Sequence, residues 1–113
     1  MNIQIIGTLK CSDTQKALRF FKERKIQVHL HDLNEKALTA GELENITRKI
    51  SVDDLLNRDG KQYAKRQLQF MVFNITDELL NDPLLIKTPI VRNGKESTIG
   101  CQPDVWKSWI AAG

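Results

Sequence analysis

A cysteine near the N-terminus is the residue of this sequence best placed to do chemistry. Cys11 follows a short apolar segment and a brief loop, and it directly precedes a segment with helical periodicity. Backbone N–H groups at a helix N-terminus stabilise an anion, so a thiol there ionises below its ordinary pKa of about 8.5. Lys10 adds a positive charge, and Ser12 and Thr14 supply hydroxyl groups that can donate hydrogen bonds to a thiolate. We therefore predict that Cys11 is nucleophilic or redox-active.

Three other groupings favour structural roles over binding sites. His29 and His31 share one face of a predicted strand, but no third metal ligand is near, which predicts a solvated edge and no metal site. Trp106 and Trp109 are at helical spacing, which indicates core packing rather than a stacking platform for bases. A basic cluster is interrupted by Asp59 and predicts a solvated helix face; its members are Arg58, Lys61, Lys65 and Arg66.

Length, composition and charge restrict the class of protein. The 113 residues suffice for one domain, with 41% hydrophobic and 27% charged residues, as is ordinary for globular proteins. A formal net charge of +3 is too small to indicate that the protein binds nucleic acid directly. No apolar run approaches the roughly 20 residues that span a bilayer, so no membrane partner is expected. The two cysteines are too few for a disulfide framework, which predicts a reducing, cytoplasmic location.

A strand before Cys11 and a helix after it must position the thiol. Residues 2–7 are an apolar run typical of a strand with both faces covered, and residues 12–25 have one apolar stripe of helical spacing. Residues 26–32 alternate between apolar and polar side chains, which predicts a strand buried on one face, often at a sheet edge. A β-α-β opening favours a parallel strand pair joined by a right-handed crossover.

Several helices and a closing hairpin are predicted for the rest of the chain. Thr39 and Glu42 have the spacing of a capping box. The predicted helices cover residues 39–50, 51–56, 61–70, 75–81 and 103–110, and the predicted strands cover residues 84–86, 89–92 and 96–100. Asn93-Gly94 is the strongest hairpin signal, and the apolar residues 70–73 are predicted to join the helices to the sheet. The expected class is α/β, with a mixed sheet and helices packed on it.

The segment around Cys11 also resembles a known family. Residues 7–17, Gly-Thr-Leu-Lys-Cys-Ser-Asp-Thr-Gln-Lys-Ala, resemble the opening of the ArsC/Spx family of thioredoxin-fold proteins. That family includes glutaredoxin-linked arsenate reductases and the Spx transcription regulators. Residues 51–58, with Leu-Leu-Asn-Arg at their end, are similar to its central segment, and residues 82–91 to its proline-containing strand. Residues 94–106 resemble its closing turn and helix, so the resemblance spans nearly the whole chain.

The resemblance implies a fold and a site. It implies one thioredoxin-like domain over residues 1–113, with a core of about 1–33 and 83–113 and a helical insertion of about 39–82. It implies a cis-proline at Pro89, which faces Cys11 across the active-site groove. The other groove residues it implies are Asn57, Arg58, Thr88 and Gln102.

The chain departs from the arsenate reductases at the positions that bind the oxyanion. Those enzymes hold the oxyanion with three arginines, and the matching positions here are Asn57, Thr88 and Gln102. Arginine binds a tetrahedral oxyanion through a charged bidentate fork, whereas these three residues donate hydrogen bonds without charge. Efficient arsenate reduction is therefore not expected of this chain, although Arg58, Lys87 and Lys10 supply nearby charge.

The function expected from these features is that of a thiol-dependent oxidoreductase, arsenate-reductase-like or glutaredoxin-like, with Cys11 as its nucleophile. Thr14 occupies the second position of the Spx Cys-x-x-Cys switch, so Cys11 would act as a monothiol. Its partner would be a thiol reductant or a thiol-containing substrate. No bound cofactor is expected, and glutathione or another low-molecular-weight thiol would be the co-substrate. Two alternatives stay open: a Spx-like redox-responsive regulator that binds RNA polymerase, and an interaction domain in which Cys11 is inert.

Overall fold

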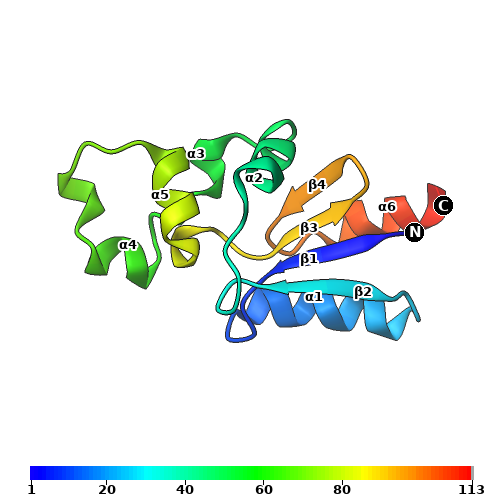
Figure 1. Ribbon diagram of the computed structural model, residues 1–113. Helices are drawn as coiled ribbons and strands as arrows, with labels where there is room; N and C mark the ends of the chain where they lie inside the picture. The colour runs from blue at the N-terminus through cyan, green and yellow to red at the C-terminus, as the bar shows by residue number, and fades with distance from the viewer. Residues whose placement is uncertain (113) are drawn as a thin grey trace. The chain divides into compact units, whose positions relative to one another are not determined.

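The computed structural model describes residues 1–112. Its central feature is a four-stranded mixed sheet (Figure 1). The strands are β1 (Ile3–Gly7), β2 (Val28–Asp32), β3 (Ile90–Asn93) and β4 (Glu96–Ile99), in the order β2-β1-β3-β4. β1 pairs in parallel with β2 and antiparallel with β3, and β3 pairs antiparallel with β4. The predicted parallel pair, the closing hairpin and the edge position of β2 are all confirmed.

The chain divides into two compact units. The sheet unit comprises Met1–Asp32 and the segment that begins at Thr88, and the helical unit comprises Leu33–Lys87. The sheet unit holds the four strands with α1 (Ser12–Glu23) and α6 (Pro103–Ala112). Within residues 1–112, no helix is both long enough and apolar enough to cross a bilayer.

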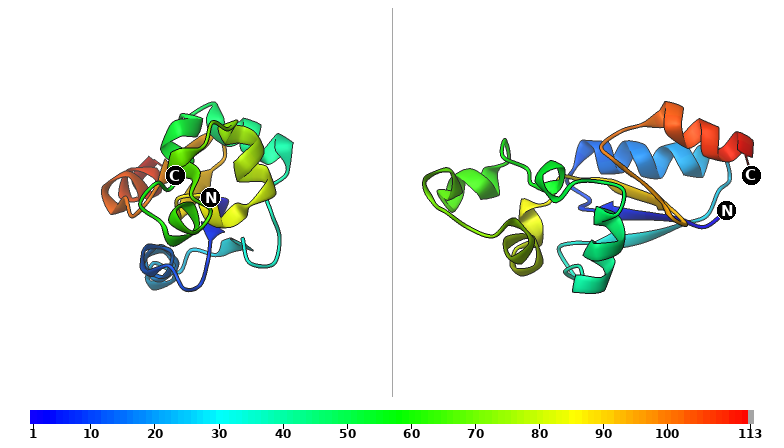
Figure 2. Two further views of the ribbon diagram at one scale, coloured as in Figure 1. Left: turned by 90° about the vertical axis from the view of Figure 1, so that its left-hand side faces the viewer. Right: turned by 90° about the horizontal axis from the view of Figure 1, so that it is seen from above.

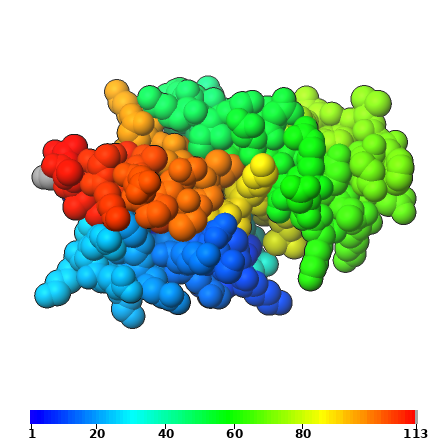
Figure 3. Space-filling model, turned by 180° about the vertical axis from the view of Figure 1, so that it is seen from behind, coloured from blue at the N-terminus to red at the C-terminus, as the bar shows by residue number. Residues whose placement is uncertain are grey.

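Helices α1 and α6 pack on the same face of the sheet and form its main core (Figure 2, right). Seen from behind, α1 and α6 lie side by side (Figure 3). Side chains of a strand point alternately to its two faces, and those of Ile3 and Ile5 point toward these helices. There they pack in one core with Phe20 and Phe21 of α1. Trp106 of α6 is fully buried against both phenylalanine rings, with centroid separations of 5.3 and 5.5 Å. The predicted core role of the tryptophan pair is confirmed for Trp106.

The hairpin between β3 and β4 closes through a two-residue loop. Asn93 pairs with Glu96, so the loop residues are Gly94 and Lys95 rather than the predicted Asn93 and Gly94. Gly94 has a φ of +59°, a conformation that glycine adopts without steric cost. The hairpin itself is where the sequence predicts it.

The helical unit contains α2 (Ala40–Thr47), α3 (Val52–Leu55), α4 (Lys61–Lys65) and α5 (Ile75–Asn81), with 3-10 helices η1 (Leu68–Phe70) and η2 (Pro83–Leu85). The capping box of α2 is confirmed. Thr39 Oγ1 accepts from the N–H of Glu42 at 3.1 Å, and the N–H of Thr39 donates to Glu42 Oε1 at 3.0 Å. These bonds satisfy two backbone donors that the first turn leaves free.

The predicted helix over residues 61–70 is wrong beyond residue 65. Gln67 takes a left-handed conformation with a φ of 55°, which ends α4 and starts the short η1. The apolar residues 70–73 were predicted to join the helices to the sheet, but most of them are exposed to solvent. Phe70 is 80% exposed, and Met71 and Val72 are exposed as well.

The predicted strand over residues 84–86 is also wrong, because the chain forms η2 there. Pro83 has a fixed φ and no N–H, which suits the first position of a helical turn. The carboxylate of Asp82 accepts from the N–H of Leu84 at 3.3 Å and caps this turn. Ile86 forms only an isolated bridge with Leu56.

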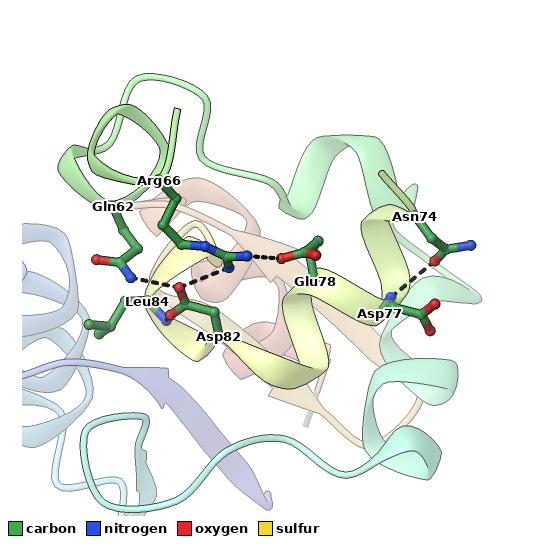
Figure 4. Close-up of polar contacts among 7 residues, drawn as sticks. All are labelled: Gln62, Arg66, Asn74, Asp77, Glu78, Asp82 and Leu84. Carbon is green, nitrogen blue, oxygen red and sulfur yellow. Dashed lines mark hydrogen bonds and ion pairs between the residues drawn. The ribbon is translucent and has the colours of Figure 1, made fainter. Parts of the chain in front are cut away.

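Part of the predicted basic helix face is paired with carboxylates (Figure 4). Arg66 forms ion pairs with Glu78 and with Asp82, the latter at 3.1 Å. Gln62 Nε2 donates to the same Asp82 carboxylate at 2.6 Å. These contacts link α4 to α5 and to the start of η2. Arg66 therefore has a structural role and is not simply part of a solvated helix face.

Candidate functional site

Cys11 lies at the N-cap of α1, immediately after the turn that leaves β1. Its backbone is extended, with φ −75° and ψ 120°, and its N–H donates to the carbonyl of Thr8 at 3.1 Å. The Cys11 carbonyl accepts the first helical hydrogen bond, from the N–H of Gln15 at 3.1 Å. The thiol is half-buried and free. The predicted strand, loop, cysteine and helix order is therefore what places the thiol at the positive end of a helix.

Thr14 lies one turn along α1 and is fully buried. Its Oγ1 has no hydrogen-bond partner among the residues that the structure describes. A buried hydroxyl without a partner costs about 1–3 kcal/mol, so an unpartnered hydroxyl beside a reactive group points to a role in a charged state. A thiolate on Cys11 supplies the missing acceptor.

Several groups act on the ionisation of Cys11, in opposite directions. Burial alone raises the pKa of the Cys11 thiol, because it disfavours the charged form. Once Cys11 ionises, hydrogen bonds to the thiolate from the hydroxyls of Thr14 and Thr88 and from the backbone N–H groups of Thr14 and Asp13 outweigh burial, so the pKa of the Cys11 thiol lies below its ordinary value. The thiolate, which is the nucleophilic form, is thereby favoured.

The loop before β3 lies beside the thiol. Cys11 Sγ donates to the carbonyl of Thr88 at 3.6 Å, across 77 residues of sequence. The Thr88–Pro89 peptide bond is cis, as the family resemblance implied. Pro89 is buried, and its carbonyl accepts from the N–H of Gly100 at 2.8 Å, which ties this loop to the end of β4.

The structure brings only some of the predicted site residues together. Cys11, Thr14 and Thr88 form one contact group. Lys10 and Ser12 are exposed, and neither is among the groups that shift the pKa of Cys11. The amide of Gln102 donates to the carbonyl of Ile99 at 3.2 Å, within its own loop.

Asn57 and Arg58 belong to the helical unit. The N–H of Asn57 donates to the carbonyl of Leu85 at 2.8 Å. Arg58 forms an ion pair with Asp53 at 3.0 Å, so its charge is already partnered. Neither residue carries a free positive charge of the kind that an arsenate site requires.

Gly7 supports the site, although the sequence predicts no role for it there. Gly7 ends β1, and a Cβ atom added there would collide with Thr14 Oγ1. The absence of a side chain at Gly7 therefore lets the buried hydroxyl of Thr14 sit against the strand. The available signal was a glycine at the end of an otherwise isoleucine-rich strand.

Substituting Gly7 by alanine is expected to displace the Thr14 hydroxyl and to raise the pKa of Cys11 toward its ordinary value. Rates of thiol alkylation as a function of pH measure this shift. Gly41→Ala is the matched control, because a Cβ there meets no atom within 4 Å and alanine favours the helix. An unchanged alkylation profile in folded Gly7→Ala protein would show that the close packing against Thr14 does not tune the thiol.

The other candidate groups are Cys101 and the two histidines of β2. Cys101 is exposed and free. His29 is exposed, but His31 is only 8% exposed, which corrects the prediction that both lie on a solvated face. Among residues 1–112 there is no group of three His, Cys, Asp or Glu side chains that could hold a metal ion.

Comparisons with known proteins agree on one family. The sequence pattern of the ArsC family matches residues 7–109. The global transcriptional regulator Spx 2 of Oceanobacillus iheyensis is 28% identical over 109 residues, which cover 92% of this chain and 80% of that protein. The solved YFFB protein superposes with a TM-score of 0.84 at 22% identity, over 95% of this chain and 97% of that one. An arsenate reductase from Vibrio cholerae superposes with a TM-score of 0.81 at 18% identity, over 96% and 97%.

The structural similarities, at such low identity, concern the fold alone. The family match covers all but the first few and last few residues. The chain therefore belongs to the ArsC family and has its thioredoxin-like fold.

Proposed function

We propose that this protein is a monothiol oxidoreductase that exchanges disulfides through Cys11. The observation that carries the proposal is the buried Thr14 hydroxyl, which has no acceptor among the described residues until Cys11 ionises. The lowered pKa of Cys11 acts in the same direction. An inert structural cysteine would need neither feature.

The proposed reaction has two balanced exchanges. The Cys11 thiolate attacks one sulfur of a mixed disulfide between a substrate and a low-molecular-weight thiol such as glutathione. The disulfide bond breaks, the substrate leaves as a thiolate, and Cys11 retains the small thiol as a new mixed disulfide. A second small thiol then attacks this bond as its thiolate, which releases the oxidised small-thiol dimer and regenerates the Cys11 thiolate. No cofactor and no second protein thiol take part.

Thr88 has a place in this reaction because its carbonyl contacts the thiol. While Cys11 is protonated, its S–H donates to the Thr88 carbonyl. Ionisation removes that donor and frees the carbonyl to accept from the backbone N–H of an extended substrate. Pro89 follows Thr88 in the same loop, so the substrate backbone would lie along Thr88 and Pro89.

Disulfide exchange suits this site better than arsenate reduction. The positions that match the three oxyanion-binding arginines carry Asn57, Thr88 and Gln102. None of these side chains is charged, and the amide of Gln102 is engaged by the backbone of Ile99. A mixed disulfide needs no such cationic cradle, because its reacting sulfur atoms are neutral.

The pH dependence of Cys11 alkylation tests the proposal. Mass spectrometry of the Cys11 peptide is expected to give a half-maximal rate at a pH below that of free glutathione. Thr14→Val removes the hydroxyl at nearly constant volume and is expected to move the half-point to higher pH, whereas Thr14→Ser keeps the hydroxyl and is the control. A half-point at or above that of free glutathione in the unmodified protein would favour the inert domain.

A Spx-like regulator is the second candidate, and the 28% identity to Spx 2 over 92% of this chain favours it. In that function the chain would bind RNA polymerase through its surface, with or without a reactive Cys11. Tagged wild-type protein and Cys11→Ser would then recover equal amounts of RNA polymerase from a lysate of the source organism. Recovery of none by either form would remove this candidate.

A further inference from the structure

A row of polar side chains crosses the sheet on the face opposite α1 and α6. Gln4 of β1 pairs with His29 of β2 on one side and with Arg92 of β3 on the other. Paired residues of neighbouring strands present their side chains on the same face. Because Ile3 and Ile5 point into the helix-covered core, Gln4 and its two partners point to the other face.

Arg92 is the residue in this row with unmet hydrogen-bonding capacity. Its Nε is shielded from solvent and has no partner among residues 1–112. Its Nη1 donates to Gln4 Oε1 at 3.4 Å, a long contact that leaves the Gln4 amide nitrogen as a further donor. Arg92 forms no ion pair with any carboxylate among residues 1–112. A buried, unpaired guanidinium N–H is costly unless an acceptor occupies the space in front of it.

An open pocket lies over this row. It has a volume of about 250 Å³ and is lined by Asn2, Gln4, His29, Arg92 and Gly94. Among these described lining residues none is acidic, and each of the four side chains carries at least one N–H that can donate. Pockets for drug-sized ligands measure roughly 300–1,000 Å³, so this one suits a smaller molecule.

We propose that this pocket binds the oxyanion group of a small molecule, and specifically a phosphate group. The guanidinium of Arg92 would shift toward the pocket on binding, so that Nε and an Nη atom each donate to one phosphate oxygen, as guanidinium groups do with tetrahedral oxyanions. The side-chain amides of Asn2 and Gln4 and the imidazole of His29 would donate to the remaining oxygen positions. Gln4, His29 and Arg92 belong to three paired strands of one sheet, so the backbone spacing of these three residues is fixed before the ligand arrives.

This site is separate from the thiol. Gln4 is three residues before Gly7, at which β1 ends, and Cys11 lies four residues further along the chain. A strand rises about 3.3 Å per residue, which places Gln4 about 10 Å from the end of β1 that leads to the thiol. The proposal therefore does not depend on the reaction at Cys11.

A ¹⁵N-correlated NMR titration of the full chain with inorganic phosphate tests the site. Saturable shifts are expected at the Arg92 Nε–H signal and at the backbone amides of Gln4 and His29. A parallel titration with glycerol phosphate distinguishes two sources of the same group: tighter binding of the ester indicates a phosphorylated small molecule, and equal binding indicates free phosphate. Shifts confined to the amides of residues 11–14 would place the anion at the thiol and overturn the proposal.

Substitutions separate a specific site from general attraction to a basic protein. Arg92→Gln is expected to weaken phosphate binding at least about tenfold, the lower end of what a charged hydrogen bond contributes. Because Arg92 is partly buried, His29→Ala provides a second variant at an exposed position, and it is expected to weaken binding while the fold is kept. Arg48→Gln removes the same charge from an exposed position and is expected to change nothing. Equal affinities in Arg92→Gln and Arg48→Gln, or no saturable shift in the unmodified protein, would overturn the proposal.

Discussion

Cys11→Ser is expected to lose all disulfide-exchange activity, with the rate falling to that measured without protein. Serine keeps the size and the hydrogen bond to the Thr88 carbonyl, but its hydroxyl does not ionise at physiological pH and forms no disulfide. The measurement is the rate at which glutathione reduces a glutathionylated peptide in the presence of each variant. Mass spectrometry of the wild-type protein during turnover is expected to show one glutathione on Cys11.

The control for this loss is the chain's other cysteine. Cys101 is exposed, and the proposed cycle does not use it. Cys101→Ser is therefore expected to keep the wild-type rate. A loss of activity in Cys101→Ser comparable with that in Cys11→Ser would replace the monothiol cycle with one in which Cys101 resolves the intermediate. Wild-type activity in Cys11→Ser would exclude Cys11 as the nucleophile.

Trp106→Ala is expected to cause the largest loss of stability of any single substitution considered for the sheet unit. Trp106 is fully buried against Phe20 and Phe21, and its Nε1 donates to Thr98 Oγ1 at 2.9 Å. Truncating a core tryptophan to alanine lowers the free energy of unfolding by about 3–5 kcal/mol, which is a large share of the roughly 5–15 kcal/mol of a small domain. Urea denaturation followed by circular dichroism measures the change.

Two variants show whether packing or the hydrogen bond dominates that loss. Trp109→Ala removes a half-buried ring from the edge of the same core and is expected to cost less than Trp106→Ala. Trp106→Phe keeps an aromatic ring against α1 but removes the donor to Thr98, so it is expected to fall between wild type and alanine. A loss in Trp109→Ala equal to that in Trp106→Ala would contradict the assignment of Trp106 as the centre of this core.

The two units differ in how closely the sequence predicts their elements. In the sheet unit, the strand, helix, strand order around Cys11 and the hairpin near Gly94 follow from apolar patterning and turn residues, both of which are local signals. In the helical unit, the bounds of α5 and the capping box of Thr39 are equally local and were also predicted. Two predicted elements are wrong, the helix over residues 61–70 and the strand over residues 84–86. Each is a short segment whose residues are compatible with more than one type of secondary structure.

Those two errors have specific physical causes. Gln67 adopts a left-handed conformation, which glutamine rarely takes and which no turn residue in its neighbourhood signals. Asp82 and Pro83 favour a capped helical turn over the strand that Leu84, Leu85 and Ile86 suggest by composition. In both cases the backbone conformation of one or two residues outweighs the hydrophobic pattern of the segment.

The family, the order of the elements and the position of Cys11 at a helix N-terminus could all be predicted, because each follows from short segments of neighbouring residues. The groups that surround the thiol could not be predicted in this way, because they come from distant parts of the chain. Thr88 is 77 residues from Cys11, and its contact requires the loop before β3 to lie beside α1. The pairing that aligns Gln4, His29 and Arg92 likewise depends on strand register across three separate segments. Such contacts arise from long-range packing and strand pairing, and these leave no periodic signal in a single sequence.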